Sequence, residues 1–179
     1  MLDPAIGLLL VGCCALLFVS AALHKLRAPA RFSEVLRAYR VLPAPLVRLA
    51  FLIPLLELTI GLGLIAPAVR TAAGGAGAAL LVLYGGAIAL NLARGRRDLA
   101  CGCGGPDEAR PIAPWMVVRN LVLAALLVAT LAPWQSRALG ATDLLTIGGG
   151  VAVATLLYVS LERLLGRVAP RTAAFGGPR

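Results

Sequence analysis

The sequence predicts an all-α fold, a bundle of transmembrane helices, from its composition and from the spacing of its apolar residues. Hydrophobic residues make up 60% of the 179 residues and charged residues only 14%. Soluble domains carry about a quarter charged residues. The apolar residues fall in runs of about 20, the length of helix that crosses the hydrocarbon core of a bilayer. A soluble domain would break them into shorter amphipathic stretches.

Five apolar runs are candidates for membrane-spanning helices. They cover approximately residues 4–23, 46–66, 71–93, 112–132 and 142–165. This leaves no room for a separate soluble domain. We predict that the first four spans form a membrane domain over residues 1–135, and that residues 136–179 add a fifth span and a basic tail. The first run lacks the basic n-region of a signal peptide and is followed by basic residues, which is typical of an anchored helix.

The basic residues of the loops predict the orientation of the helices. Most of them alternate with the spans and would lie on one side: Lys25, Arg27, Arg31, Arg37, Arg40, Arg48, Arg94, Arg96, Arg97, Arg110, Arg163, Arg167, Arg171 and Arg179. The opposite side has only Arg70 and Arg137. The positive-inside rule then predicts a multi-pass protein of a bacterial cytoplasmic membrane, with the N-terminus outside and the C-terminus cytoplasmic. Topology and anionic lipid account for the net charge of +9, so we expect no nucleic-acid partner.

Several further patterns suit a helical membrane protein. Phe32, Val35, Leu36 and Tyr39 recur at helical spacing among polar residues, which predicts a short amphipathic helix over 31–40 on the membrane surface. Trp115 and Trp134 bracket the fourth span, 19 residues or roughly 28 Å apart, and are expected to be interfacial anchors. Glycines are frequent in the third and fifth spans, where we expect them to allow close helix packing. They are Gly74, Gly75, Gly77, Gly85, Gly86, Gly148, Gly149 and Gly150.

The loop before the fourth span contains the motif Cys101-Gly-Cys103-Gly-Gly. The two cysteines are close enough in sequence to form a strained, readily exchanged disulfide, and nearby arginines favour the reactive thiolate. Two alternatives stay open at this point: a metal site with His24 as a third ligand, and a loop with incidental cysteines. Cys13 and Cys14 lie within the first span, where buried cysteine usually acts as a small apolar residue.

A second group of candidate residues is polar and lies within the apolar spans or at their ends. Glu57 lies near the middle of the second span, where a carboxylate should face the bundle interior and have a partner. We expect that partner to be Lys25 or Arg119. The predicted topology brings seven residues to one membrane face, with Glu57 beneath them: His24, Lys25, Asn91, Cys101, Cys103, Arg119 and Asn120.

Taken in order, several of these segments resemble the MauE family of methylamine utilisation proteins. The matching segments are His24-Lys25-Leu26-Arg27 with Phe32, Ala38-Tyr39-Arg40 with Pro43, Pro54-Leu55-Leu56-Glu57 with Gly61, Ala89-Leu90-Asn91 with Arg94-Gly95-Arg96 and Asp98, Cys101-Gly102-Cys103-Gly104, and Trp115 with Val118-Arg119-Asn120. The resemblance covers about residues 5–132 and implies a four-helix core, shared with the related DoxX/DoxD group. The fifth span lies outside it.

The resemblance implies a maturation factor for the disulfide-rich small subunit of methylamine dehydrogenase, or for a similar exported protein. It also implies a thioredoxin-like partner of the MauD type. The chain would be a membrane thiol–disulfide oxidoreductase or an accessory factor, with Cys101 and Cys103 as the exchanging pair. The charge pattern places this pair on the cytoplasmic face, whereas disulfides of exported proteins form outside.

The leading hypothesis gives roles to the remaining polar residues. Glu57 and His24 would assist catalysis by proton transfer, and Asn91, Arg119 and Asn120 would contact a quinone or the partner. One alternative is a DoxX-like subunit of a quinone-linked oxidoreductase with structural cysteines. Another is a small transporter or metal-handling protein, although the sequence shows no inverted repeat.

Overall fold

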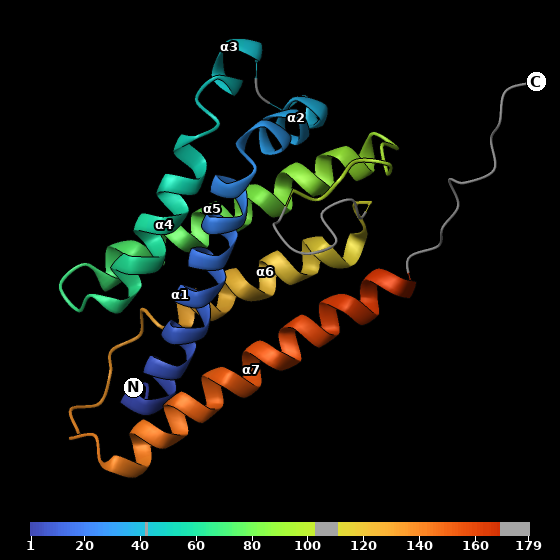
Figure 1. Cartoon of the computed structure of the whole chain (residues 1–179). Helices are drawn as coiled ribbons and strands as arrows, with labels where there is room; N and C mark the ends of the chain where they lie inside the picture. Colours follow the sequence, from blue (N-terminus) through green and yellow to red (C-terminus); the bar gives the residue numbers. More distant parts are fainter. Residues whose placement is uncertain (42, 103–110, 169–179) are drawn as a thin grey trace, which may run out of the picture.

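The computed structural model describes residues 1–41, 43–102 and 111–168, and these residues form helices joined by turns and loops (Figure 1). The helices are α1 Pro4–Arg27, α2 Pro29–Tyr39, α3 Ala44–Val47, α4 Leu52–Ile65, α5 Arg70–Ala93, α6 Pro114–Ala129 and α7 Ala141–Val168. Within the described ranges, β-structure is limited to two isolated bridges, Leu2 with Trp134 and Ala100 with Pro111. The predicted all-α fold is confirmed.

The five predicted spans appear as five apolar helices of two lengths. Helices α1, α5 and α7 are long and apolar enough to cross a membrane, whereas α4 and α6 have 14 and 16 residues. A 14-residue helix is about 21 Å long, against a hydrocarbon core of about 30 Å. The second span is shorter than predicted because Pro43 and Pro45 begin a separate short helix, α3, and turns follow it. The fourth begins at Pro114, where a proline suits the first turn of a helix.

Local sequence explains where α1 and α2 begin and end. The side chain of Asp3 caps α1 by accepting a hydrogen bond from the backbone N–H of Ala5, 2.8 Å away. The last turn of α1 carries His24, Lys25 and Arg27, whose charge suits the helix C-terminus. Helix α2 confirms the predicted amphipathic helix and ends at Arg40, which has a left-handed conformation with φ of 50°.

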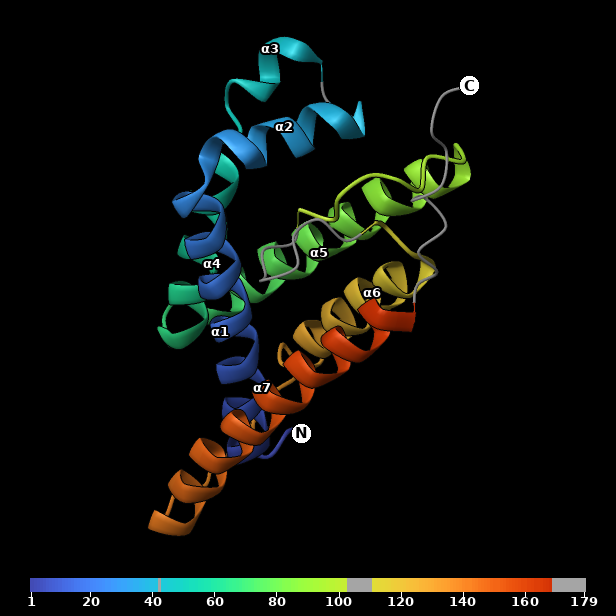
Figure 2. The same ribbon diagram turned by 45° about the vertical axis from the view of Figure 1, so that its right-hand side comes forward.

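Two helix pairs form the centre of the molecule. Helix α1 packs on α4, α5 packs on α6, and α4 also contacts α5 (Figures 1 and 2). Phe18, Leu64 and Leu127 are fully buried where these helices meet. Helix α7 packs chiefly on α1 and lies along the outside of the bundle.

Glycines allow some of these close approaches, as predicted, but not all of them do. A Cβ atom on Gly61 would lie 2.8 Å from Val19 Cγ2 of α1, and one on Gly77 would lie 3.1 Å from Phe18. A side chain at Gly150 of α7 would meet Leu9. In contrast, Gly75, Gly86, Gly148 and Gly149 have open space around the position of a Cβ atom, so the packing prediction is wrong for these four.

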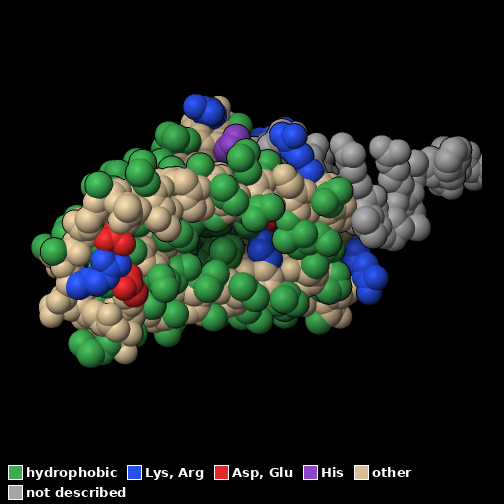
Figure 3. Space-filling model, turned by 90° about the horizontal axis from the view of Figure 1, so that it is seen from below, with side chains coloured by type: hydrophobic (Ala, Val, Ile, Leu, Met, Phe, Trp, Pro, Cys, Tyr) green, Lys and Arg blue, Asp and Glu red, His purple; other side chains and the backbone are tan. Residues whose placement is uncertain are grey.

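The outer surface is as apolar as a lipid-facing surface should be. Large hydrophobic side chains project outward from several helices, for example Leu83, Leu145 and Leu156, each at least 68% exposed. Figure 3 shows hydrophobic side chains over most of the visible face. Exposure on this scale is incompatible with water as the surrounding solvent. The chain is therefore a helical membrane protein whose surroundings are the lipid bilayer.

Candidate functional site

A cavity of about 670 Å³ lies between α1, α5, α6 and α7, with α2 at one end. Figure 3 shows a hollow in this face, bordered mainly by hydrophobic side chains with a basic side chain beside it. On α1 the lining extends from Leu9 to Lys25, roughly 24 Å by helix rise. Most of the wall is aliphatic, and the polar groups gather where α1 ends. The cavity is therefore long and apolar, with one polar end.

Three side chains from three helices form a buried cluster in the wall of this cavity. Lys25 of α1 and Glu57 of α4 form an ion pair, with Nζ and Oε1 2.5 Å apart and side-chain exposures of 5% and 1%. The hydroxyl of Tyr84 on α5 donates to the same Oε1 atom at 2.8 Å. The Lys25 ammonium also lies over the rings of Phe32 and Tyr84, at 5.5 and 5.3 Å. We call Lys25, Glu57 and Tyr84 the buried cluster.

The second carboxylate oxygen of Glu57 is the unusual atom of this cluster. Oε2 is buried and has no hydrogen-bond partner among the described residues. A buried polar atom without a partner carries a large desolvation penalty. Because Glu57 lines the cavity, a polar group of a bound molecule or a water could supply the missing hydrogen bond. This arrangement suits a binding site or a proton-transfer site.

Arg119 is not the partner of Glu57, although the sequence allowed that pairing. It forms an ion pair with Glu162 of α7, with a separation of 2.6 Å from Nη1 to Oε1, and it lies over the ring of Trp115 at 5.6 Å. Both members of the pair line the cavity. Asn120, the next residue of α6, also lines it and donates to the backbone oxygen of Met116 at 2.8 Å. The Arg119–Glu162 pair therefore joins α6 to α7 across the cavity.

The chain carrying Cys101 reaches the polar end of the cavity through contacts with α2. The bridge between Ala100 and Pro111 closes the base of the loop just before Cys101. The Tyr39 hydroxyl donates to the backbone oxygen of Cys101 at 3.2 Å. Burial raises the pKa of Tyr39 to about 12, so this donor stays protonated. Gly102 has φ of +66°, and a Cβ atom there would meet Val35 Cγ1 at 2.7 Å, so glycine is required at this position.

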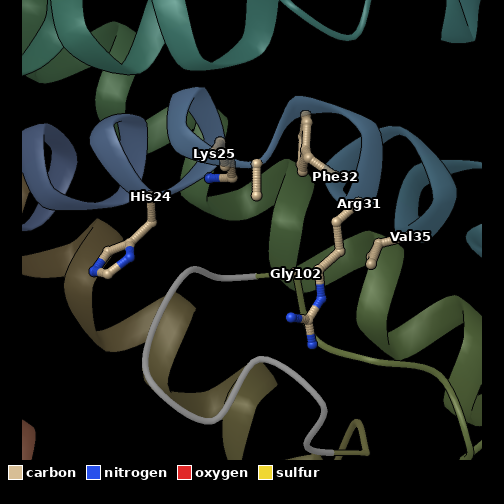
Figure 4. A pocket seen from close by; sticks show the side chains of 7 residues that line it. His24, Lys25, Arg31, Phe32, Val35 and Gly102 are labelled. Atoms are coloured by element: carbon tan, nitrogen blue, oxygen red, sulfur yellow. The ribbon is translucent and has the colours of Figure 1, made fainter.

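Cys101 is disulfide-bonded and lines the cavity, whereas Cys103 lies outside the described residues. His24 lines the cavity as well, and it also borders a small neighbouring pocket with Lys25, Arg31, Phe32, Val35 and Gly102. Figure 4 shows Arg31 and Val35 of α2 beside the chain at Gly102, and His24 extending from α1 on the other side of Lys25. The polar end therefore brings together His24, the buried cluster and a cysteine in the disulfide state.

Asn91 is the one described candidate that lies away from the cavity. It is fully buried, donates to the backbone oxygen of Ala87, and accepts a hydrogen bond from Arg96 Nη1 at 2.9 Å. Arg96 in turn donates to the backbone oxygens of Ala38 and Tyr39, at 2.6 and 3.4 Å. Asn91 thus fixes Arg96, and Arg96 fixes the C-terminal end of α2.

Comparison with known proteins agrees with this picture. The family model described as "Methylamine utilisation protein MauE" matches residues 3–135, from α1 through α6. That match covers most of the chain. The chain belongs to the MauE family. A protein named methylamine utilization protein MauE from Paracoccus denitrificans is 40% identical over 89% of this chain and 87% of its own length.

Two other MauE proteins have similar sequence identity and coverage. The protein from Methylophilus methylotrophus is 32% identical over 92% of this chain and 88% of its own length, and that from Paracoccus versutus is 39% identical over 98% and 96%. No solved structure matches the chain. The similarity to these MauE proteins extends beyond residue 135, where the family model ends. The match to the Paracoccus versutus protein covers 98% of this chain and therefore includes α7.

Sequence reasoning missed four residues that shape the site of this MauE-family chain: Tyr39, Tyr84, Arg96 and Glu162. Tyr84 and Glu162 are polar residues within apolar helices, and that signal could have drawn attention to them. The role of Arg96 had no such signal, because it reads as one more basic residue in a basic loop. Among the described residues, no group of three or more His, Cys, Asp or Glu side chains could hold a metal ion.

Proposed function

We propose that the protein acts in methylamine utilisation as a membrane thiol–disulfide exchange factor, with Cys101 as an exchanging residue. Its relatives are named for methylamine utilisation, and its family model carries the same description. The observation that carries the proposal is the placement of a disulfide-bonded Cys101 at the polar end of the cavity, beside His24 and the buried cluster.

The exchange itself is chemically balanced. A thiolate of a thioredoxin-like partner, of the MauD type, attacks a sulfur of the Cys101 disulfide, so that one S–S bond breaks and a mixed disulfide forms. The second thiol of the partner then attacks the mixed disulfide. The partner leaves with a disulfide and the loop is left with two thiols. Maturation of the methylamine dehydrogenase small subunit, or of a similar exported protein, would lie downstream of this step.

Three features support reactivity at this position. Gly102 has no side chain, which lets the backbone next to Cys101 pack closely against Val35 of α2. Arg96 holds the end of α2, and Tyr39 of α2 holds the backbone of Cys101, so Cys101 is presented from a fixed position. His24, at the same end of the cavity, carries an imidazole that can donate or accept a hydrogen bond.

The loop would face the cytoplasm in the orientation that the basic residues predict, with the N-terminus of α1 outside. We propose this topology for a bacterial cytoplasmic membrane, and the exchange partner would then meet the loop on the cytoplasmic face. A membrane-impermeant maleimide added to intact cells tests it. Cys101 of a Cys103→Ser variant should be protected until the cells are permeabilised, and labelling in intact cells would show the inverted topology.

The exchange is tested by trapping Cys101 with an alkylating reagent in cells grown on methylamine. In cells whose partner carries serine in place of its second cysteine, the mixed disulfide formed by attack on the loop disulfide cannot be resolved by the partner, so it should accumulate and migrate as a larger species that reductant removes. A background with Cys13→Ala and Cys14→Ala excludes the other two thiols.

The same cells separate the leading function from its alternative. If the loop exchanges disulfides, the double variant Cys101→Ser/Cys103→Ser should lose growth on methylamine. If the double variant grows normally, no mixed disulfide forms, and Glu57→Gln alone abolishes growth, the proposal is wrong. A DoxX-like oxidoreductase subunit with structural cysteines would then be the better description.

A further inference from the structure

The shape and lining of the cavity define the kind of molecule that would fill it. The wall is aliphatic along α1 from Leu9 to the last turn, and Ala154 and Val159 of α7 continue it on the other side. The polar groups lie together at one end. Such a cavity suits a long apolar molecule with a single compact polar end, oriented along α1.

The charges at the polar end favour a neutral head group. Lys25 is paired with Glu57, and Arg119 is paired with Glu162, so these two cations already have a carboxylate. A phospholipid brings a phosphate, which would have to compete with these carboxylates for the same cations. A neutral ring with oxygen substituents avoids that competition.

The hydrogen-bonding groups at this end match such a ring. Oε2 of Glu57 is buried without a partner and, as a carboxylate oxygen, accepts a hydrogen bond from a hydroxyl group. His24, which lines the same end, carries a ring N–H that can donate to a carbonyl oxygen. A ring that alternates between carbonyl and hydroxyl oxygens would use both residues.

The disulfide of Cys101, in the same cavity, indicates which kind of ring would bind there. Cys101 lines the same cavity and is in the disulfide state. After each exchange with the partner, the loop is left as a dithiol and needs a two-electron acceptor to become a disulfide again. A quinone is apolar and lipid-soluble, and it accepts two electrons and two protons.

We propose that the cavity binds a membrane quinone, with its ring beside Glu57, His24 and Cys101 and its tail along α1 and α7, and that this quinone reoxidises the loop. The inference rests on the proposed function. In the reaction two S–H bonds break and one S–S bond forms. The two electrons pass to the ring, and the two protons end on its two oxygens, which gives a quinol.

Binding is tested first, without any thiol chemistry. Purified full-length protein in detergent is titrated with a benzoquinone that carries a decyl chain, and quenching of tryptophan fluorescence is followed. Trp115 is a suitable reporter because it stacks on Arg119, which lines the cavity. We expect saturable quenching. Ala154→Phe, which fills the cavity, should weaken binding by roughly tenfold or more, equal to about 1.4 kcal/mol.

A matched control is available on the same helix. Ala152 lies two residues before Ala154, is exposed, and does not line the cavity, so Ala152→Phe should bind the quinone like the unmodified protein. Equal weakening by both variants, or quenching that never saturates, would overturn the inference. So would organic extraction of protein purified from its native membrane that yields phospholipid and no quinone from the cavity.

Electron transfer is tested separately. Protein reduced with dithiothreitol and freed of excess reductant should reduce the same quinone, seen as loss of its ultraviolet absorbance, with one quinone consumed per dithiol. Cys101→Ser should reduce none. If the mixed disulfide forms in cells but the purified protein does not bind the quinone, the exchange function stands and this inference is wrong. Quinone binding without a mixed disulfide would refute the exchange function.

Discussion

The two ends of α1 each carry a cluster of charged residues, and the two clusters differ in burial and in how completely they are hydrogen-bonded. At the N-terminal end, Arg137 lies between Asp3 and Asp143 and donates to all four of their carboxylate oxygens at 2.7–3.1 Å. These side chains are 20–38% exposed. At the other end, the buried cluster is almost fully enclosed, and Glu57 Oε2 has no partner.

This difference separates a structural cluster from a candidate functional one. The Arg137 cluster closes the connection between α1 and α7, next to the backbone hydrogen bonds that join Leu2 to Pro133 and Gln135, and leaves no carboxylate oxygen open. Exposed ion pairs of this kind add little to stability. The buried cluster has a large desolvation penalty to offset and still leaves one carboxylate oxygen without a hydrogen-bond partner among the described residues.

Glu57→Gln should have the largest effect on stability. It leaves the Lys25 ammonium buried without a counter-charge, and breaking a buried ion pair in this way costs about 3–5 kcal/mol. Thermal unfolding in detergent, followed by tryptophan fluorescence, measures the loss. The double variant Lys25→Met/Glu57→Gln removes both charges and should recover most of the stability. If the single variant unfolds at the same temperature as the unmodified protein, Glu57 is not buried as a charged partner of Lys25.

Tyr84→Phe should have the next largest effect. It removes the 2.8 Å hydrogen bond to Glu57 Oε1 but keeps the ion pair and the ring packing. A hydrogen bond to a charged group contributes about 1.5–3 kcal/mol, so the loss should be smaller than that of Glu57→Gln. In the Lys25→Met/Glu57→Gln background the same change should matter less, because the charged acceptor is gone. An equal loss in both backgrounds would mean that Tyr84 contributes through packing alone.

Gly61→Ala should disturb the contact between α1 and α4 that encloses the buried cluster. The added methyl would lie 2.8 Å from Val19 Cγ2 and 3.1 Å from the backbone oxygen of Ala15, so the helices must move apart. Such overpacking costs about 1–3 kcal/mol. Gly86→Ala is the matched control, since nothing lies within 4 Å of its Cβ position. Its melting temperature should be unchanged or higher, and a fall equal to that of Gly61→Ala would contradict the packing shown here.

Asp3→Asn should have the smallest effect at neutral pH. Asparagine still caps α1, and the lost ion pair is exposed. The hydrogen bond from Arg137 holds the pKa of Asp3 below its ordinary value of 3.8. A lowered folded-state pKa means that the stabilisation is complete above pH 3.8 and is lost as the pH falls below that value. The difference in melting temperature between the two proteins should therefore disappear on acidification. A difference that grows toward low pH would contradict the ion pair.

Composition and hydrophobic runs were sufficient to predict the all-α membrane fold. In a bilayer, a spanning segment must satisfy its backbone hydrogen bonds without water, and a long apolar run does so as an α-helix. The pairing of Glu57 with Lys25 was one of two predicted options, since a buried carboxylate requires a cation. The lengths of α4 and α6 were not predictable from hydropathy alone. Prolines 43 and 45 begin the separate helix α3, so that α4 starts only at Leu52, and Pro114 begins α6.

The remaining parts of the site depend on contacts that are distant in sequence. Tyr84 reaches Glu57 across 27 residues, and Arg119 reaches Glu162 across 43, so neither pair leaves a local pattern. The same holds for the contact of Tyr39 with Cys101, across 62 residues. Sequence spacing identified which residue types were out of place in an apolar chain, whereas only the packed helices show which of them meet.

We propose that the buried cluster serves the chemistry of Cys101, whereas the Arg137 cluster is structural. This proposal is tested most directly by the rate at which Cys101 returns to the disulfide state in cells after a pulse of dithiothreitol, measured by alkylation at successive times. Reoxidation should be at least tenfold slower in Lys25→Met/Glu57→Gln, roughly 1.4 kcal/mol in the barrier, and unchanged in Arg137→Gln. Equal rates in all three proteins, at equal amounts in the membrane, would contradict the account.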